Sequence, residues 1–146
     1  MIILIYGGSF DPPHLGHSAL LKAAAQRLKP DRVLILPAWQ NPFKGAARSS
    51  PSARLAMLRL GVLRRLSPAL RRFCRIDRAE LRLGRRVYTV ESLRRLRRLH
   101  PHAELHFLTG SDAAAGFKTW KKPDELRRLA EWHSGARGGK AAAIPA

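Results

Sequence analysis

A run of apolar residues that leads directly into a glycine turn constrains this chain more than any other feature. Residues 2–6 read Ile-Ile-Leu-Ile-Tyr, and residues 7–17 continue as Gly-Gly-Ser-Phe-Asp-Pro-Pro-His-Leu-Gly-His. The pattern predicts a buried strand, a tight turn and then the start of a helix. Glycine lets backbone N–H groups approach an anion closely, and a helix start carries partial positive charge. The segment therefore indicates a pocket for a polyphosphate.

The turn itself supplies the backbone of this predicted site. We expect Gly7, Gly8, Ser9 and Phe10 to offer N–H groups to the same anion, because they lie between the strand and the helix. Asp11 is expected to brace the turn by accepting backbone N–H groups, as aspartate commonly does in turns. A Gly-Gly turn is weak evidence alone, but the Phe-Asp-Pro-Pro-His that follows makes it specific.

Two histidines at the start of the helix are the predicted catalytic residues. His14 and His17 are three positions apart, so both rings lie on one face of a helix. From there they can hydrogen-bond a triphosphate and stabilise the charge on a departing pyrophosphate. A zinc pair is one alternative, but such a site needs three or four ligands, and no cysteine or histidine cluster completes it. Helix capping is the other alternative, and the sequence predicts no metal site.

Apolar strand-like runs alternate with amphipathic segments along most of the chain. Strands are predicted over residues 2–6, 32–37, 73–77 and 103–108, and helices over about 15–28, 50–66, 89–99 and 123–131. This alternation favours an α/β fold, a Rossmann-like open parallel sheet of about four strands with helices on both faces. Ligands of such sheets bind beyond the carboxyl ends of the strands, where the glycine turn lies.

The end of the chain departs from this alternation. No apolar run follows residue 131, and residues 132–146 are rich in alanine and glycine. We therefore expect a domain over residues 1–131 that lacks its C-terminal strand, and a flexible tail over residues 132–146. Without a fifth strand, residues 105–108 would form an unpaired sheet edge with apolar side chains near water, which invites aggregation.

The spacing His14-x-Gly-His17 after Gly-Gly-Ser-Phe-Asp-Pro resembles the signature of nucleotidyltransferases, and its Pro-Pro-His form resembles nicotinate-nucleotide adenylyltransferases. The resemblance covers about residues 1–130. It implies adenylyl transfer from ATP to nicotinate mononucleotide, which gives deamido-NAD and pyrophosphate in NAD biosynthesis. It also implies that ATP carries Mg²⁺ on its triphosphate, and that His17 is the more critical histidine.

The same resemblance implies further site residues. Lys44 would contact a phosphate, Tyr88 and Thr89 would lie against the nicotinate group, Asp112 would hold ribose hydroxyls, and Trp120 would stack on the pyridine ring. Each has an ordinary alternative that stays open. Lys44 is then an exposed lysine, Thr89 an N-cap, and Trp120 a packing residue.

The chain also departs from the family it resembles. Members carry an Ile-Ser-Ser-Thr-x-Ile-Arg segment after a fifth strand, and this chain has nothing like it. Weak or no turnover is the corresponding expectation. Two alternatives to the nicotinate enzyme stay open, a non-catalytic nucleotide-binding remnant and an enzyme similar to pantetheine-phosphate adenylyltransferase.

Charge raises a nucleic-acid hypothesis that the pattern does not favour. The 146 residues carry 28 Lys and Arg against 10 Asp and Glu, a net charge of +18. Thirteen arginines lie between Arg64 and Arg98, mostly in pairs, and no aromatic residues are interleaved to stack on bases. We expect a solvated basic surface, small nucleotides as partners and no specific nucleic acid. The single cysteine, Cys74, and the short apolar runs favour a cytoplasmic protein without a membrane span.

Overall fold

One sheet organises the molecule. The computed structural model describes residues 1–39, 49–135 and 141–143. Within these residues the strand order is β3-β2-β1-β4-β5-β6, in which the first five strands run parallel and β6 is antiparallel to β5. The strands are β1 (Ile2–Gly8), β2 (Arg32–Pro37), β3 (Cys74–Ile76), β4 (Glu104–Thr109), β5 (Glu131–Gly135) and β6 (Ala141–Ala143).

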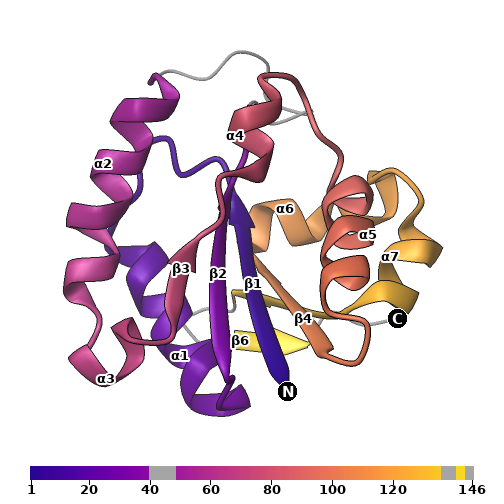
Figure 1. The fold of residues 1–146 in the computed structure, drawn as a ribbon, viewed down its shortest axis with the longest axis horizontal. Coiled ribbons are helices and arrows are strands. Elements are labelled where there is room, and N and C mark those ends of the chain that lie inside the picture. The colour runs from indigo at the N-terminus through magenta and orange to yellow at the C-terminus, as the bar shows by residue number, and fades with distance from the viewer. Residues whose placement is uncertain (40–48, 136–140, 144–146) are drawn as a thin grey trace.

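Helices cover both faces of this sheet, as Figure 1 shows. Buried side chains of α1 and α2 pack on one face, and those of α5 and α7 pack on the other. The Rossmann-like α/β class predicted from the sequence is confirmed. The helices are α1 (Leu15–Leu28), α2 (Pro51–Gly61), α3 (Pro68–Arg71), α4 (Ala79–Leu83), α5 (Thr89–Leu99), α6 (Ser111–Ala115) and α7 (Pro123–Leu129), with 3₁₀ turns at Leu63–Arg65 and Phe117–Thr119.

The central strand β1 is buried on both faces. Its odd-numbered residues Ile3 and Ile5 join the core beneath α5 and α7, whereas Leu4 and Tyr6 join the core beneath α1 and α2. Successive side chains of a strand point to opposite faces, so an unbroken apolar run is what a strand covered on both sides requires. This explains why residues 2–6 carry no polar side chain.

The expectation of a missing C-terminal strand was wrong. Residues 131–135 form β5, which pairs in parallel with β4 in the register Phe107↔Trp132 and Leu108↔His133. Residues 105–108 are therefore not an unpaired edge, and residues 132–135, which were assigned to the tail, belong to the sheet. The prediction failed because it looked for an apolar run. Strand β5 instead buries a histidine, and the hydrogen bond between His133 Nε2 and His106 Nδ1 (2.8 Å) makes that burial tolerable.

Arginines on the helices divide into two groups. The pairs at residues 64–65, 71–72 and 85–86 are exposed, as a solvated basic surface requires, although Arg85 also contacts Glu91 Oε1 at 3.2 Å. By contrast, Arg94 of α5 donates two hydrogen bonds to the carboxylate of Glu125 on α7, with N–O distances of 2.5 and 2.7 Å. Arg95 Nη2 donates to Asp77 Oδ2 at 2.6 Å. Some of the arginines therefore form ion pairs that link α5 to α7 and to Asp77. No helix among the described residues is long and apolar enough to cross a membrane.

Candidate active site

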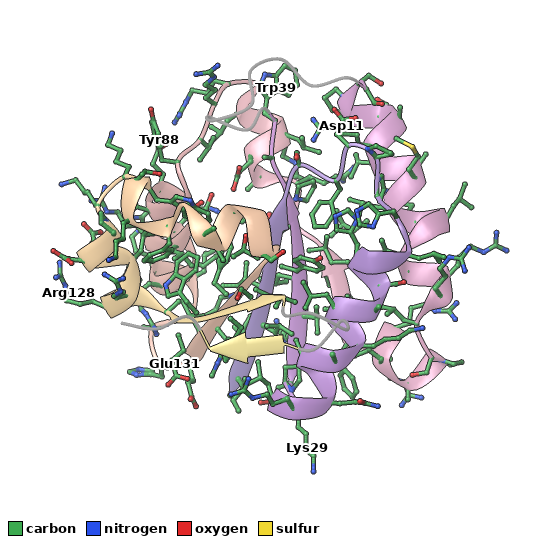
Figure 2. The ribbon with its side chains drawn as sticks, turned by 180° about the vertical axis from the view of Figure 1, so that it is seen from behind. Asp11, Lys29, Trp39, Tyr88, Arg128 and Glu131 are labelled. Atoms are coloured by element: carbon green, nitrogen blue, oxygen red, sulfur yellow. The ribbon has the colours of Figure 1, made fainter. Side chains whose placement is uncertain are left out.

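The site lies where the direction of the strand order reverses. Strand β1 pairs with β2 on one side and with β4 on the other, so the chain leaves the sheet in opposite directions from this point. In open α/β sheets the crevice beyond the carboxyl ends of such strands is where ligands bind. Figure 2 shows Asp11, Trp39 and Tyr88 at this same end of the molecule, although they come from three separate segments.

The two histidines form a stacked pair at the start of α1. Their ring centroids are 3.9 Å apart, with 23° between the planes. His14 Nδ1 accepts the N–H of Gly16 (3.1 Å), and His17 Nδ1 accepts the N–H of His14 (2.9 Å). Because each Nδ1 accepts a hydrogen bond, the proton of each neutral ring is on Nε2. The histidines therefore cap the helix and also hold two Nε2–H donors on one face of its start.

The ring of His17 packs against a buried aromatic side chain. Phe10 is buried, with its ring 4.9 Å from that of His17 and 5.1 Å from that of Tyr6, measured between centroids. Its backbone adopts φ = 50°, a left-handed conformation that a residue with a side chain rarely takes. The sequence assigned only the Phe10 backbone to the site, and the structure adds a ring that fixes the position of His17.

Two glycines of the motif are explained by close approach. A Cβ atom on Gly7 would lie 2.3 Å from Phe107 Cζ, so the ring of Phe107 packs directly on this part of β1. A Cβ atom on Gly16 would lie 2.9 Å from His14 Cε1. The glycine between the two histidines therefore leaves room for the His14 ring to fold back over the helix start.

This close contact leads to a prediction for Gly16→Ala. We expect the added methyl group to push the His14 ring away. The kcat/KM of the reaction expected from the sequence should then fall roughly 10- to 100-fold, as happens when a group that contacts substrate is misplaced. Stability should change little, because the gain of about 0.5–1 kcal/mol from alanine inside a helix is offset by the weakened His14 cap on this N–H. Steady-state kinetics and urea unfolding measure the two effects separately.

The matched control is Gly61→Ala at the end of α2, where nothing lies within 4 Å of the added Cβ atom. This variant should keep wild-type kinetics. If Gly16→Ala also kept them, the position of the His14 ring would not matter for the reaction.

A buried arginine that the sequence analysis missed ties the turn to its surroundings. Arg54 of α2 is fully buried and donates to the carbonyls of Ser9 (2.8 Å), Ala38 (2.5 Å) and Trp39 (2.9 Å). The signal was present, because Arg54 precedes buried Leu58 by four residues and so occupies the apolar face of α2.

Asp11 braces the turn from another direction. Its carboxylate accepts the N–H of Ser49 at 3.1 Å, across the loop that leads into α2. The expectation that Asp11 accepts a backbone N–H is thus confirmed, with a donor distant in the sequence rather than in its own turn. Together with Arg54, it anchors the turn to the residues on either side of the loop.

A cavity of about 360 Å³ opens beside the turn and gathers most of the predicted binding residues. These are Gly7, Gly8, Ser9, Tyr88, Thr89 and Trp120. The remaining lining residues are Leu36, Ala38, Glu80, Val87, Phe107, Thr109, Ala113, Gly116, Thr119, Lys121 and Leu126. Apolar walls and a few hydroxyl groups characterise sites for small molecules with a flat ring.

Other predicted residues lie outside this cavity. His14 and His17 do not line it, and the two parts of the site meet at the turn, where Ser9 lines the cavity and Phe10 packs on His17. Asp112 is in the first turn of α6, directly after β4. Lys44 lies outside the described residues.

Two of the lining aromatic residues have structural contacts of their own. The N–H of Tyr88 donates to Glu91 Oε2 at 2.8 Å, which lowers the pKa of this carboxyl, and Lys121 Nζ lies 4.7 Å from the centre of the Tyr88 ring. Trp120 is half-buried and packs edge to face on Trp132, with centroids 5.5 Å apart. Trp120 is therefore a packing residue that also forms part of the cavity wall.

One buried carboxyl in the wall was not predicted. Glu80 of α4 is buried and accepts the hydroxyl hydrogen of Ser92 at 2.7 Å. Burial raises the pKa of Glu80 to about 7, and the Ser92 hydrogen bond opposes this rise. No local pattern marks this residue, because its burial depends on how α4 packs over the sheet.

A glycine turn and a histidine-capped helix at the switch point of a parallel sheet define a nucleotide-binding α/β protein. A family model described as cytidylyltransferase-like matches residues 5–140. A relative from Nitratiruptor sp. is 40% identical over 95% of this chain and 75% of its own length, and one from Chlorobium phaeovibrioides is 41% identical over 96% and 71%. Both are named "Probable nicotinate-nucleotide adenylyltransferase". The chain belongs to the cytidylyltransferase-like family and, within it, to the nicotinate-nucleotide adenylyltransferases.

Solved structures agree on the fold. The chain superposes on the Plasmodium falciparum nicotinic acid mononucleotide adenylyltransferase complexed with NaAD with a TM-score of 0.79 and 20% identity, covering 93% of this chain and 64% of that one. A putative nicotinate-nucleotide adenylyltransferase from Vibrio parahaemolyticus gives a TM-score of 0.73 at 21% identity, covering 92% and 73%. The chain thus spans about two thirds to three quarters of these proteins.

Proposed function

We propose that this chain transfers the adenylyl group of ATP to nicotinate mononucleotide, forming deamido-NAD and pyrophosphate as a step of NAD biosynthesis. The observation that carries the proposal is the stacked pair of His14 and His17, which holds two Nε2–H donors at a helix start beside a nucleotide-sized cavity. The curated relatives, which carry the name of this activity, support it.

The proposed reaction needs positioning and charge neutralisation more than proton transfer. A phosphate oxygen of nicotinate mononucleotide, already ionised at neutral pH, attacks the α-phosphorus of ATP, and the bond to pyrophosphate breaks. The Nε2–H groups of His14 and His17 donate to the phosphate oxygens on which charge accumulates. The turn at Gly7–Phe10 and the start of α1 hold the triphosphate so that the nucleophile, the phosphorus and the leaving group stay in line.

The cavity is assigned to nicotinate mononucleotide. Trp120 and Phe107 offer flat apolar surfaces to a pyridine ring, and the hydroxyl of Thr89 lies at the start of α5, where backbone N–H groups suit a carboxylate. We further propose that Asp112 binds ribose hydroxyls and that Lys44 contacts a phosphate.

The site fits a Mg²⁺ ion that is bound by ATP and not by the protein's own carboxylates. Among the described residues that line the cavity, Glu80 is the only carboxyl group, and it is occupied by Ser92. Mg²⁺ would then be held mainly by the triphosphate oxygens, where it supplies charge neutralisation. The chain would contribute the positions of the phosphates, through the turn and the two histidines.

We also propose a reducing, cytoplasmic setting for this reaction. Cys74 is a buried free thiol, and burial raises its pKa to about 11, so it stays protonated and unreactive. The proposed partners are small nucleotides only.

A direct assay tests the proposed function. The full chain is mixed with ATP, Mg²⁺ and nicotinate mononucleotide, and pyrophosphate release and dinucleotide formation are followed together. We expect deamido-NAD in amounts equal to the released pyrophosphate, and faster turnover than with nicotinamide mononucleotide. Pantetheine phosphate serves as the competing acceptor.

Two outcomes would contradict the proposal. Adenylylation of pantetheine phosphate but not of nicotinate mononucleotide would reassign the acceptor. Binding of ATP and nicotinate mononucleotide without pyrophosphate release at saturating concentrations would identify a nucleotide-binding protein that does not catalyse transfer.

A further inference from the structure

A second group of chemically active side chains lies at the other end of the sheet. His106 on β4 faces Glu131 and His133 on β5, and one ligand atom from each of these three residues lies within 4.8 Å of the other two. The register explains the grouping, since His106 is paired with Glu131 and residues two apart on a strand share a face. Figure 2 shows Glu131 far from Tyr88 and Trp39, so this group is separate from the proposed active site.

The contacts of this group bring together three atoms that can each carry a lone pair. Glu104 Oε1 lies 3.1 Å from His106 Nε2, and a carboxylate can only accept, so this nitrogen carries a proton. In neutral His106 the Nδ1 atom then has a lone pair, which faces His133 Nε2 at 2.8 Å and Glu131 Oε2 at 3.5 Å. Three atoms that can each offer a lone pair thus converge, and either a shared proton or a metal ion must hold them together.

One nitrogen of this group is left unpaired by the hydrogen bonds of the described residues. His133 is 4% exposed, and its Nδ1 atom has no hydrogen-bond partner within the described residues. An unpaired buried polar atom costs stability. The atom that faces His106 is Nε2, so an ion between the three side chains would contact Nε2 and not Nδ1.

We propose that His106, His133 and Glu131 form a binding site for a divalent transition-metal ion such as Zn²⁺, which links β5 to the rest of the sheet. Two nitrogens and a carboxylate oxygen, with water in a fourth position, are an established ligand set for zinc. Glu104 on the far nitrogen of His106 supplies the outer carboxylate that orients metal-binding histidines. Two nitrogens bound to zinc lie about 3.4 Å apart, so the rings need to separate by roughly half an ångström.

Access and charge are both compatible with this site. The side chains of Glu131 and Glu104 are 66% and 57% exposed, so an ion can enter from solvent although both histidines are buried. The carboxylates of Glu131 and Glu104 favour a bound cation, whereas the charge of Arg27 acts against it.

The test measures metal binding in the full chain, independently of turnover. The chain is stripped with EDTA and titrated with Zn²⁺ by calorimetry, and thermal unfolding is followed with and without Zn²⁺. We expect one zinc per chain and a melting temperature that rises with zinc concentration, since a ligand that binds the folded state stabilises it. Co²⁺ should give the visible absorption of a tetrahedral site.

Variants locate the bound ion. His106→Gln should abolish stoichiometric binding, and Glu131→Gln, at an exposed side chain where folding is not at risk, should weaken it at least tenfold. Glu104→Gln should weaken it roughly 10- to 100-fold through the orientation of His106. His102→Gln is the control, because this histidine is exposed, lies before β4 and is not one of the three grouped residues.

Three results would overturn the proposal. One is the absence of zinc binding with an unchanged melting temperature, which would leave a proton shared between the two histidines. Another is stoichiometric zinc that survives both His106→Gln and Glu131→Gln. The third is zinc that is lost only when His14 and His17 are both replaced, which would place the metal on the helix start. The first two results have no bearing on the adenylyl-transfer assay, so the two proposals can fail separately.

Discussion

Replacing His17 with alanine should lower kcat/KM for adenylyl transfer about 10²- to 10³-fold, the usual effect of removing one donor that stabilises charge in the transition state. The loss should fall mainly on kcat, because the Nε2–H group matters most as pyrophosphate departs. The variant should also lose stability by about 0.5–2 kcal/mol, since His17 Nδ1 accepts the N–H of His14 at the start of α1.

A glutamate at the same position separates these two effects. Three residues after the N-cap, a glutamate side chain accepts the N-cap N–H as a histidine does, so His17→Glu should restore much of the stability. It offers no donor and brings negative charge to the phosphate site, so its activity should be no higher than that of His17→Ala. Urea unfolding and steady-state kinetics on both variants give the comparison.

His102→Ala, at an exposed histidine far along the chain, should change neither quantity. If His17→Glu recovered activity along with stability, His17 would act only as a helix cap, and the proposed mechanism would lose its main catalytic group.

Arg54→Met should reduce the free energy of unfolding by about 3–5 kcal/mol, the largest effect on stability that we expect from a single substitution. Methionine matches the length of the side chain but leaves the carbonyls of Ser9, Ala38 and Trp39 without their donor. Chemical denaturation measures the change. Because Ser9 belongs to the phosphate turn, KM for ATP should also rise.

Two further variants make this prediction specific. Arg59→Met removes an exposed arginine from the same helix and should cost less than about 0.5 kcal/mol. Arg54→Lys retains the positive charge but not the planar group that reaches three carbonyls at once, so its stability should lie between wild type and Arg54→Met. Equal stability of Arg54→Met and Arg59→Met would mean that the buried guanidinium does not hold the turn.

Features built from consecutive residues were predictable from the sequence, and features built by packing were not. The strand at residues 2–6, the turn and α1 follow from apolar periodicity and glycine, and the pairing of His14 with His17 follows from helical spacing. Arg54 was recoverable from its place on the apolar face of α2. Glu80 was not, because its burial arises from an element far from it in the sequence.

Strand β5 could not be predicted from hydrophobicity alone. Strand β5 was missed because its sequence, Glu-Trp-His-Ser-Gly, alternates between a buried tryptophan on one face and a buried histidine on the other. A histidine in a strand counts as polar, yet it is readily buried once a partner such as His106 accepts or donates a hydrogen bond. The 24 residues between His106 and Glu131 likewise conceal any shared ligand set from an analysis of local spacing.

The contact between Gly7 and Phe107 makes these two positions one steric unit, although 100 residues separate them. Any side chain at position 7 would have to occupy the volume of the Phe107 ring, so an alanine can be accommodated there only alongside a smaller residue at position 107. The size of the side chain at position 107, which lines the cavity, and the presence of glycine at position 7 therefore depend on each other. Changes at the two sites are expected to be strongly non-additive, each harmful by itself and tolerated as a pair.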